Sequence, residues 1–251
     1  MKTFPWVMLS MAFLVGSVGM VGVDEAQSNA VLDKAIKALG GEAKLTKAVA
    51  FSRKAKGTIS FGGNDSKFTS ESIIQGLDRY QSTFEGEFEG NKVQGVTILN
   101  GEKGWRKFGD FKSEMDKDST ANEKRNVYLQ VVPCTILPLK GKEFKVESAG
   151  ELKVGDKPAA VLKVTGRDGK EFTLAFDKDS GVPVRLVAKV LGFQGEEFTQ
   201  ETTFGDYKDI GGIKLATKIE SKRDGESFLK QEITEFTVLE KVDPKSFAEP
   251  E

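Results

Sequence analysis

The stretch that decides the fold is TTFGDYKDIGGIKLATKIESKRDG, from Thr202 to Gly225. It has the pattern of a strand, a Gly-Gly turn, a second strand and an Arg-Asp-Gly turn. Glycine adopts the positive φ angles of tight hairpin turns without steric cost. The stretch therefore predicts antiparallel strands joined edge to edge, each with one apolar side that another layer must cover.

The same pattern extends over most of the chain. Apolar and polar residues alternate with period two over 48–109 and again from about residue 157 to 238. Asn100-Gly101 and Asp168-Gly169 are strong signals for short hairpin turns. The alternation predicts about ten or eleven strands, paired with their neighbours in sequence.

Two segments have the pattern of helices instead. NAVLDKAIKALGG (29–41) places its apolar residues on one stripe and stops at Gly40, and a short second turn follows it. DSTANEKRNVYLQVVP (118–133) lies between two blocks of strands. For this helix the sequence predicts a capping box from Thr120 to Glu123 and an end at Pro133.

Residues 1–30 have the pattern of an export signal. Lys2 is followed by an uncharged stretch from Phe4 to Val23 and then by acidic residues. Cleavage is expected near residues 26–30, which leaves 31–251 as a single domain in the periplasm or another space outside the cytoplasm. The alternative is an uncleaved anchor, because about twenty apolar residues can span a bilayer.

Composition excludes several classes of site. The 251 residues include no histidine, which rules out Ser-His-Asp and Cys-His nucleophiles, histidine-based zinc sites and histidine-bound haem. Cys134 is the one cysteine, so no intrachain disulfide can form. The net charge of −1 gives no basic surplus for nucleic acid. We expect no catalytic residues, no metal and no cofactor, and we expect a monomer.

One-sided strands with few helices leave two architectures open. Two sheets can cover each other, or one curved sheet can wrap around the helices. The curved sheet, partly closed by the helices, uses all the predicted elements. A gap between sheet and helices that side chains do not fill could hold an apolar ligand.

The chain resembles the outer-membrane lipoprotein-sorting (LolA/LolB-like) superfamily. The resemblance rests on ALGG (38–41), LNGEKGWR (99–106), LAFDKDSGVPVRL (174–186), FGDYKDIGGIKLATKI (204–219) and the closing VDPKSFAEP. It implies a mainly β (α+β) fold, in which one curved antiparallel sheet forms an unclosed half-barrel with helices as a lid over an apolar cavity. It also implies a carrier without enzymatic activity that binds acyl chains of lipids or lipoproteins and exchanges them with membrane-bound donor and acceptor proteins.

The apolar faces of the strands and the middle helix supply the expected ligand-binding residues. For the cavity wall these are Tyr80, Phe84, Trp105, Phe172, Leu174 and Phe176, and for the lid they are Tyr128, Val131 and Val132. The alternative for each residue is ordinary core packing. Two other functions stay open at this point. One is an interaction or sensor module that binds a partner protein with the same fold, and the other is a hydrolase that uses carboxylates.

Overall fold

The computed structural model describes residues 20–251 except 62, 89 and 193–194. Most of the predicted export signal lies outside the described residues. Within them, no helix has both the length and the apolar character needed to cross a membrane.

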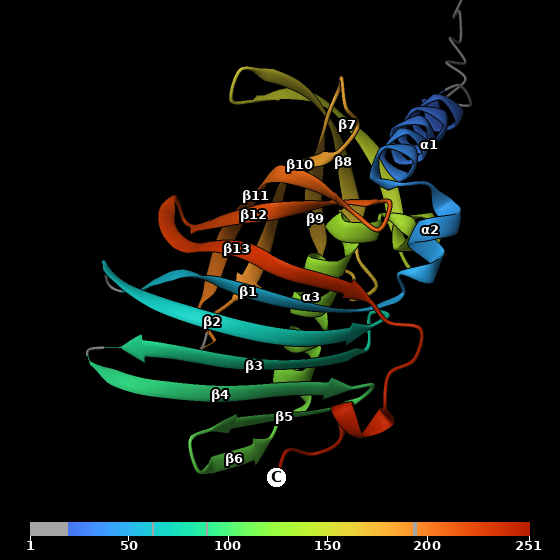
Figure 1. The fold of residues 1–251 in the computed structure, drawn as a ribbon. Helices are drawn as coiled ribbons and strands as arrows, with labels where there is room; N and C mark the ends of the chain where they lie inside the picture. Colours follow the sequence, from blue (N-terminus) through green and yellow to red (C-terminus); the bar gives the residue numbers. More distant parts are fainter. Residues whose placement is uncertain (1–19, 62, 89, 193–194) are drawn as a thin grey trace, which may run out of the picture.

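The described strands form one antiparallel sheet of thirteen strands (Figure 1). This is more than the ten or eleven expected, because the sequence pattern did not resolve the shortest and most polar strands. The strands are β1 Ala50–Phe61, β2 Asn64–Gln75, β3 Arg79–Phe88, β4 Asn91–Asn100, β5 Lys103–Phe108, β6 Phe111–Glu114, β7 Lys145–Val154, β8 Lys157–Thr165, β9 Glu171–Asp177, β10 Pro183–Leu191, β11 Glu197–Ile210, β12 Ile213–Arg223 and β13 Glu226–Val238.

The strand order explains the curved, open shape. It runs β6-β5-β4-β3-β2-β1-β13-β12-β11-β10-β9-β8-β7, so two meanders join where β1 pairs with β13. The outermost strands, β6 and β7, do not pair with each other in the described part of the chain. The predicted mainly β fold with one unclosed sheet is confirmed. The opening stretch spans the end of β11, β12 and the β12–β13 turn, where Asp224 and Gly225 adopt positive φ.

Few helices accompany the sheet. They are α1 Met20–Leu39, α2 Glu42–Lys47, α3 Lys117–Thr135 and the short 3-10 turns η1 Leu137–Lys140 and η2 Pro244–Phe247. In Figure 1, α1 and α2 lie at one end of the half-barrel, and α3 runs across the sheet behind β1–β5.

The boundaries of α3 differ from the predicted ones. The Asp116 side chain caps the helix by accepting a hydrogen bond from the Ser119 backbone at 2.7 Å, so the cap lies before the predicted box at Thr120. Pro133 lies inside the helix, which continues to Thr135 and ends at Ile136 in a left-handed conformation. Pro133 lacks the N–H that would bond to the Leu129 carbonyl, so the helix has one hydrogen bond fewer there, and Pro133 is buried.

The largest hydrophobic cluster fills the end of the half-barrel next to α1. The predicted apolar stripe of α1 packs into this cluster against the second half of α3 and the strands β8–β12. Its members include Leu32, Ala35, Ile36, Leu39, Tyr128, Val132, Leu162, Phe172, Leu174, Phe176, Leu186 and Leu215. The opposite end, at the β1–β2, β3–β4 and β12–β13 turns, has no such cover in the described residues.

The turn after α1 makes a close contact with the β11–β12 turn. Gly40 has φ +129°, and a Cβ added there would lie 2.4 Å from the Gly212 carbonyl oxygen. Gly41 also has a positive φ, +87°, but a Cβ there would meet nothing within 4 Å. Only a glycine at position 40 therefore lets the end of α1 rest on this turn.

We expect Gly40→Ala to lower the free energy of unfolding by about 1–3 kcal/mol more than Gly41→Ala does. Both variants carry the backbone strain of a positive φ, so their difference isolates the contact with Gly212. Urea denaturation of the two variants measures it. Equal losses would show that the α1 end does not rest on the turn.

Candidate functional site

Two adjoining cavities lie between α3 and the concave face of the sheet. Their volumes are about 280 Å³ and 450 Å³. They share the residues Glu123, Asn126, Arg223 and Phe228, so the two cavities lie next to each other. We call the two together the inner groove, with a deep lobe (the smaller cavity) and a mouth lobe (the larger one).

Five aromatic side chains contribute to the lining of the mouth lobe. They are Tyr80, near the start of β3, and Phe84, Phe88, Phe108 and Phe228. The rings of Phe84 and Phe88 are 6.0 Å apart, and Phe84 also stacks on Phe68 at 5.5 Å. Ring contacts at these distances stabilise the wall of the lobe in addition to the burial of apolar area.

The deep lobe continues the apolar surface beneath α3. Its apolar lining includes Leu129, Leu186, Val190, Phe204, Tyr207, Leu215, Ile219 and Leu229. Along β12 it runs from Arg223 to Leu215, roughly 26 Å at about 3.3 Å per residue. The deep lobe is therefore elongated along β12, with apolar side chains over much of its lining.

A few polar groups interrupt these walls. Arg106 forms an ion pair with Glu123 of α3 at 3.2 Å. Arg53 donates from Nε to Ser72 Oγ at 3.1 Å and from a terminal nitrogen to Gln130 Oε1. These contacts bridge the helix to β1, β2 and β5 across the groove.

Glu123 is buried at 7% exposure, and burial raises its pKa above the ordinary glutamate value. The charge of Arg106 opposes the shift but is the smaller effect. The folded state thus holds this proton at pH values where the unfolded chain has lost it. Glu123 therefore stabilises the fold fully below its unfolded pKa, and the contribution falls as pH rises through the raised pKa.

We expect the pH dependence of stability to differ between the wild type and Glu123→Gln. As pH rises above the ordinary glutamate pKa, the wild type should lose stability relative to the variant, which cannot ionise here. Chemical denaturation from pH 4 to 8 measures the difference. Parallel curves would contradict the raised pKa.

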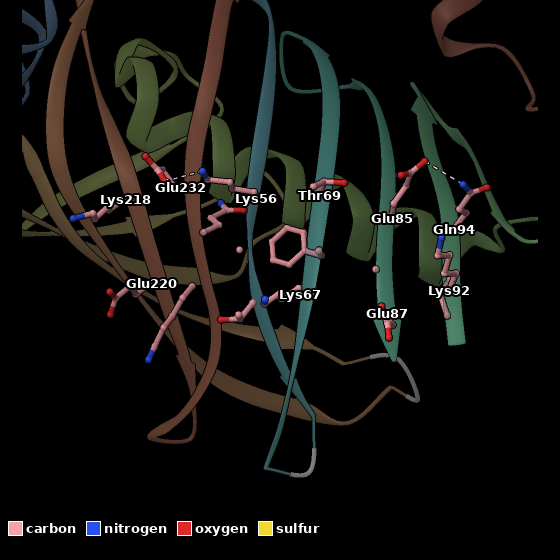
Figure 2. A pocket seen from close by; sticks show the side chains of 17 residues that line it. Lys56, Lys67, Thr69, Glu85, Glu87, Lys92, Gln94, Lys218, Glu220 and Glu232 are labelled. Atoms are coloured by element: carbon pink, nitrogen blue, oxygen red, sulfur yellow. Dashed lines mark hydrogen bonds and ion pairs between the residues drawn. The ribbon is translucent and has the colours of Figure 1, made fainter. Parts of the chain in front are cut away.

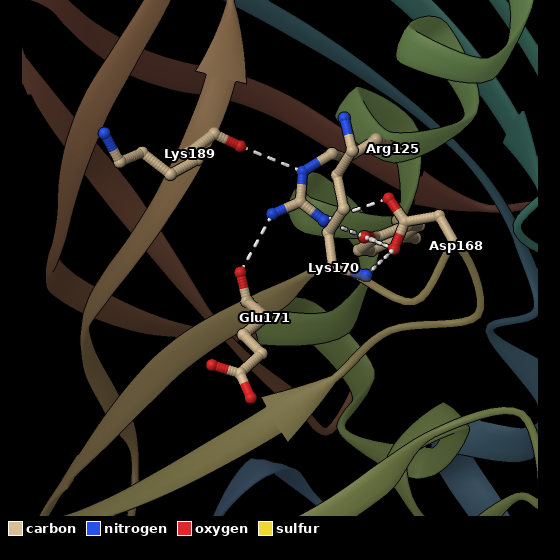
Figure 3. A network of polar contacts seen from close by, with 6 residues as sticks. Arg125, Asp168, Lys170, Glu171 and Lys189 are labelled. Carbon is tan, nitrogen blue, oxygen red and sulfur yellow. Dashed lines mark hydrogen bonds and ion pairs between the residues drawn. The ribbon is translucent and has the colours of Figure 1, made fainter.

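A polar network around the buried Arg125 side chain fixes α3 to the sheet (Figure 3). The Arg125 side chain is 2% exposed and donates to the carbonyl oxygens of Lys189 and Glu171, at 2.9 and 3.0 Å. It also pairs with Asp168 at 3.0 Å and contacts the Tyr128 hydroxyl, which donates to Asp168 at 2.8 Å. The network joins the helix to β10 and to the β8–β9 turn.

A second link extends from the same turn. Arg167 donates to both carboxylate oxygens of Asp78 in the β2–β3 turn, and this hydrogen-bonded ion pair lowers the Asp78 pKa. The two meanders are therefore tied together at the covered end, next to α3. Together these links hold one wall of the inner groove in place.

The structure distributes the predicted wall residues over three places. Tyr80 and Phe84 line the mouth lobe. Phe172, Leu174 and Phe176 lie in the packed cluster at the covered end. Trp105 precedes Arg106, which lines the groove, so strand alternation puts Trp105 on the opposite, outer face.

The predicted lid residues are all buried under α3. Tyr128 and Val132 belong to the large cluster, whereas Val131 packs with Tyr80 in a smaller one. The helix instead presents Glu123, Asn126, Leu129, Gln130 and Pro133 to the groove. Their spacing follows one face of a helix, and this was the signal available in the sequence. Because this face is partly polar, the prediction from apolar residues did not include it.

A larger hollow, of about 780 Å³, lies on the outer face of β1–β4, β12 and β13 (Figure 2). The side chains labelled there occupy strand positions that alternate with those facing α3. They are mostly charged, with contacts such as Lys56–Glu232 at 3.7 Å and Gln94–Glu85 at 3.1 Å. An exposed surface of mixed charges is poorly suited to an apolar ligand, so we assign the site to the inner groove.

The described residues offer little for catalysis. They contain no group of three or more acidic or cysteine side chains that could hold a metal. The Cys134 thiol donates to the Gln130 carbonyl at 3.3 Å, and burial raises its pKa, which disfavours the reactive thiolate.

Comparison with known proteins gives a likeness of fold. No protein-family model and no curated protein matches the sequence. Among solved structures, a LolA superfamily protein from Nitrosomonas europaea is similar with a TM-score of 0.60 at 9% identity, over 88% of this chain and 97% of that one. A DUF1329 family protein from Desulfovibrio piger has a TM-score of 0.56 at 15% identity, with the same shares covered.

A proposed outer membrane lipoprotein-sorting protein domain from Vibrio parahaemolyticus has a TM-score of 0.51 at 8% identity, over 86% of this chain and 97% of that one. Identities this low establish the architecture alone. The chain therefore has the fold seen in LolA superfamily and DUF1329 proteins, an unclosed antiparallel sheet around a few helices.

Proposed function

We propose that this protein binds the acyl chain of a lipid or lipoprotein in the inner groove and carries it outside the cytoplasm without chemical change. The observation that supports this most is the space between α3 and the concave face, with an elongated deep lobe and aromatic side chains in the mouth lobe. The mouth lobe alone, at about 450 Å³, is within the range of small-molecule sites.

The energetics favour an acyl ligand. Burial of each methylene is worth about 0.8 kcal/mol, so a chain of about fourteen carbons gains roughly 11 kcal/mol before the cost of ordering it. The groove walls supply the apolar area for this burial. An acyl chain can also extend along the lining of the deep lobe beside β12.

Two further observations support the proposal. The predicted export signal would deliver the protein to the periplasm or to another space outside the cytoplasm. The fold is the one seen in the LolA superfamily protein and in the proposed lipoprotein-sorting domain. Exchange with membrane-bound donor and acceptor proteins through the aromatic mouth follows from this function.

Mass spectrometry of lipids extracted from the natively purified protein tests the proposal. We expect acyl lipids to co-purify in amounts comparable to the protein, and a fluorescent fatty-acid probe to bind after they are removed. A ligand-free protein that also ignores the probe would overturn the proposal. If that protein retrieved one partner protein from its own compartment, the alternative of an interaction module would replace it.

A further inference from the structure

One arginine at the meeting point of the two lobes has unusual surroundings. Arg223, at the end of β12, lines both the deep lobe and the mouth lobe. Its guanidinium carbon lies 3.6 Å from the centre of the Phe228 ring and 5.1 Å from that of Phe198. Its Nε donates to Gln200 Oε1 at 3.2 Å. The rings and the amide therefore fix the plane of the guanidinium group.

The charge of Arg223 lacks a direct partner in the described part of the chain. No carboxylate there forms an ion pair with it, and its two terminal nitrogens make no hydrogen bond to a described residue. Burial lowers its pKa, which the charge of Glu196 only partly offsets. A partly desolvated cation is costly unless an anion compensates it. The groove thus contains a fixed positive charge whose two terminal nitrogens donate to no residue that the structure describes.

These donors have the geometry that anions with paired oxygens require. A guanidinium group binds a carboxylate or a phosphate through two parallel hydrogen bonds. The apolar walls on either side of Arg223 accept a hydrocarbon chain, in the deep lobe or in the mouth lobe. An amphiphile with one anionic head and one long chain would satisfy both features.

We propose that the inner groove takes single-chain amphiphiles with an anionic head, of which a long-chain fatty acid is the simplest, and that Arg223 binds the head. This rests on the function proposed above and adds the ligand class. Because the arginine is already oriented by Phe228 and Gln200, little conformational freedom is lost when the head binds.

Displacement of a fluorescent fatty-acid probe by tetradecanoate and by tetradecanol tests the proposal, in the full chain and in Arg223→Met. Loss of a two-pronged charged contact should weaken tetradecanoate about ten- to a hundredfold. Tetradecanol should change less than about twofold, because it lacks the charge. Tetradecyl phosphate, the second anionic head, should follow tetradecanoate.

Two further variants control the result. Arg223→Lys keeps the charge but loses the fork, so we expect an intermediate loss. Arg79→Met makes the same change at an exposed position outside the groove and should leave all affinities unchanged. If Arg223→Met does not fold, Arg223→Lys still tests the proposal.

The outcomes separate the two proposals. If tetradecanoate and tetradecanol weaken equally in Arg223→Met, or if neither changes, the role of Arg223 is wrong while the acyl-binding function stands. If the wild type binds neither compound, the acyl-binding function itself is wrong, and the inference about the head fails with it.

Discussion

Replacement of Arg125 by methionine is expected to lower the free energy of unfolding by about 3 kcal/mol, because it removes a buried charged side chain that donates hydrogen bonds to two backbone carbonyls and to Asp168. Methionine leaves the carbonyl groups of Lys189 and Glu171 without the Arg125 donor. It also removes one of the two α3 contacts with Asp168, and the Tyr128 hydroxyl remains as the other. Urea denaturation, followed by far-UV circular dichroism, measures the loss.

Lys163→Met is the matched control. Lys163 lies on β8 and pairs with Glu171 at 2.7 Å, but both side chains are about half exposed. Such pairs contribute less than about 1 kcal/mol. If the two variants lost the same stability, the buried network would not be what holds α3 against the sheet.

Replacement of Ser82 by phenylalanine is expected to reduce the affinity for a fluorescent fatty-acid probe at least about tenfold, a difference of about 1.4 kcal/mol. Ser82 lines the mouth lobe on the same face of β3 as Tyr80 and Phe84. A phenyl group there occupies space that the ligand needs. Stability should change little, because the ring fills a cavity with apolar walls instead of a packed core.

Thr83→Phe provides the comparison, since the adjacent strand position points to the outer face. It adds the same side chain to the same strand without entering the groove. We expect the probe to bind this variant with the wild-type affinity. Equal losses in both variants, or full binding by Ser82→Phe, would place the ligand elsewhere.

The architecture could be predicted from the sequence to a large extent. Alternation with period two identifies strands, because successive side chains of a strand point to opposite faces. The turn signals at Asn100-Gly101 and Asp168-Gly169 then join the strands into hairpins. One-sided strands with few helices favour a single curved sheet, as observed. The short β6, whose residues are exposed or only partly buried, gave no such signal.

The candidate site could be predicted only in part, for a physical reason. Alternation shows which side of a strand is apolar, but it does not show what covers that side. Phe84 and Phe172 have the same pattern, yet Phe84 lines a cavity and Phe172 is packed beneath α3. The difference depends on where α3 crosses the sheet, which is set by contacts distant in sequence such as Arg125 with Asp168.

The polar groups of the groove could not be predicted from the sequence for a different reason. Glu123, Gln130 and Arg223 are polar or charged. Such residues are usually exposed to solvent on a strand or helix. Their position facing an interior space follows from the curvature of the sheet, which brings β12 and α3 together. No local pattern in the sequence shows how close β12 and α3 lie to each other in the fold.

Photo-cross-linking most directly tests the claim that the inner groove is the binding site. The probe is a fatty acid with a diazirine at the end of its chain, and labelled peptides are identified by mass spectrometry. We expect labels on the groove face of α3 and on the inner positions of β3, β12 and β13, with competition by tetradecanoate. Labels confined to the outer face of the sheet, or unaffected by the competitor, would contradict the account.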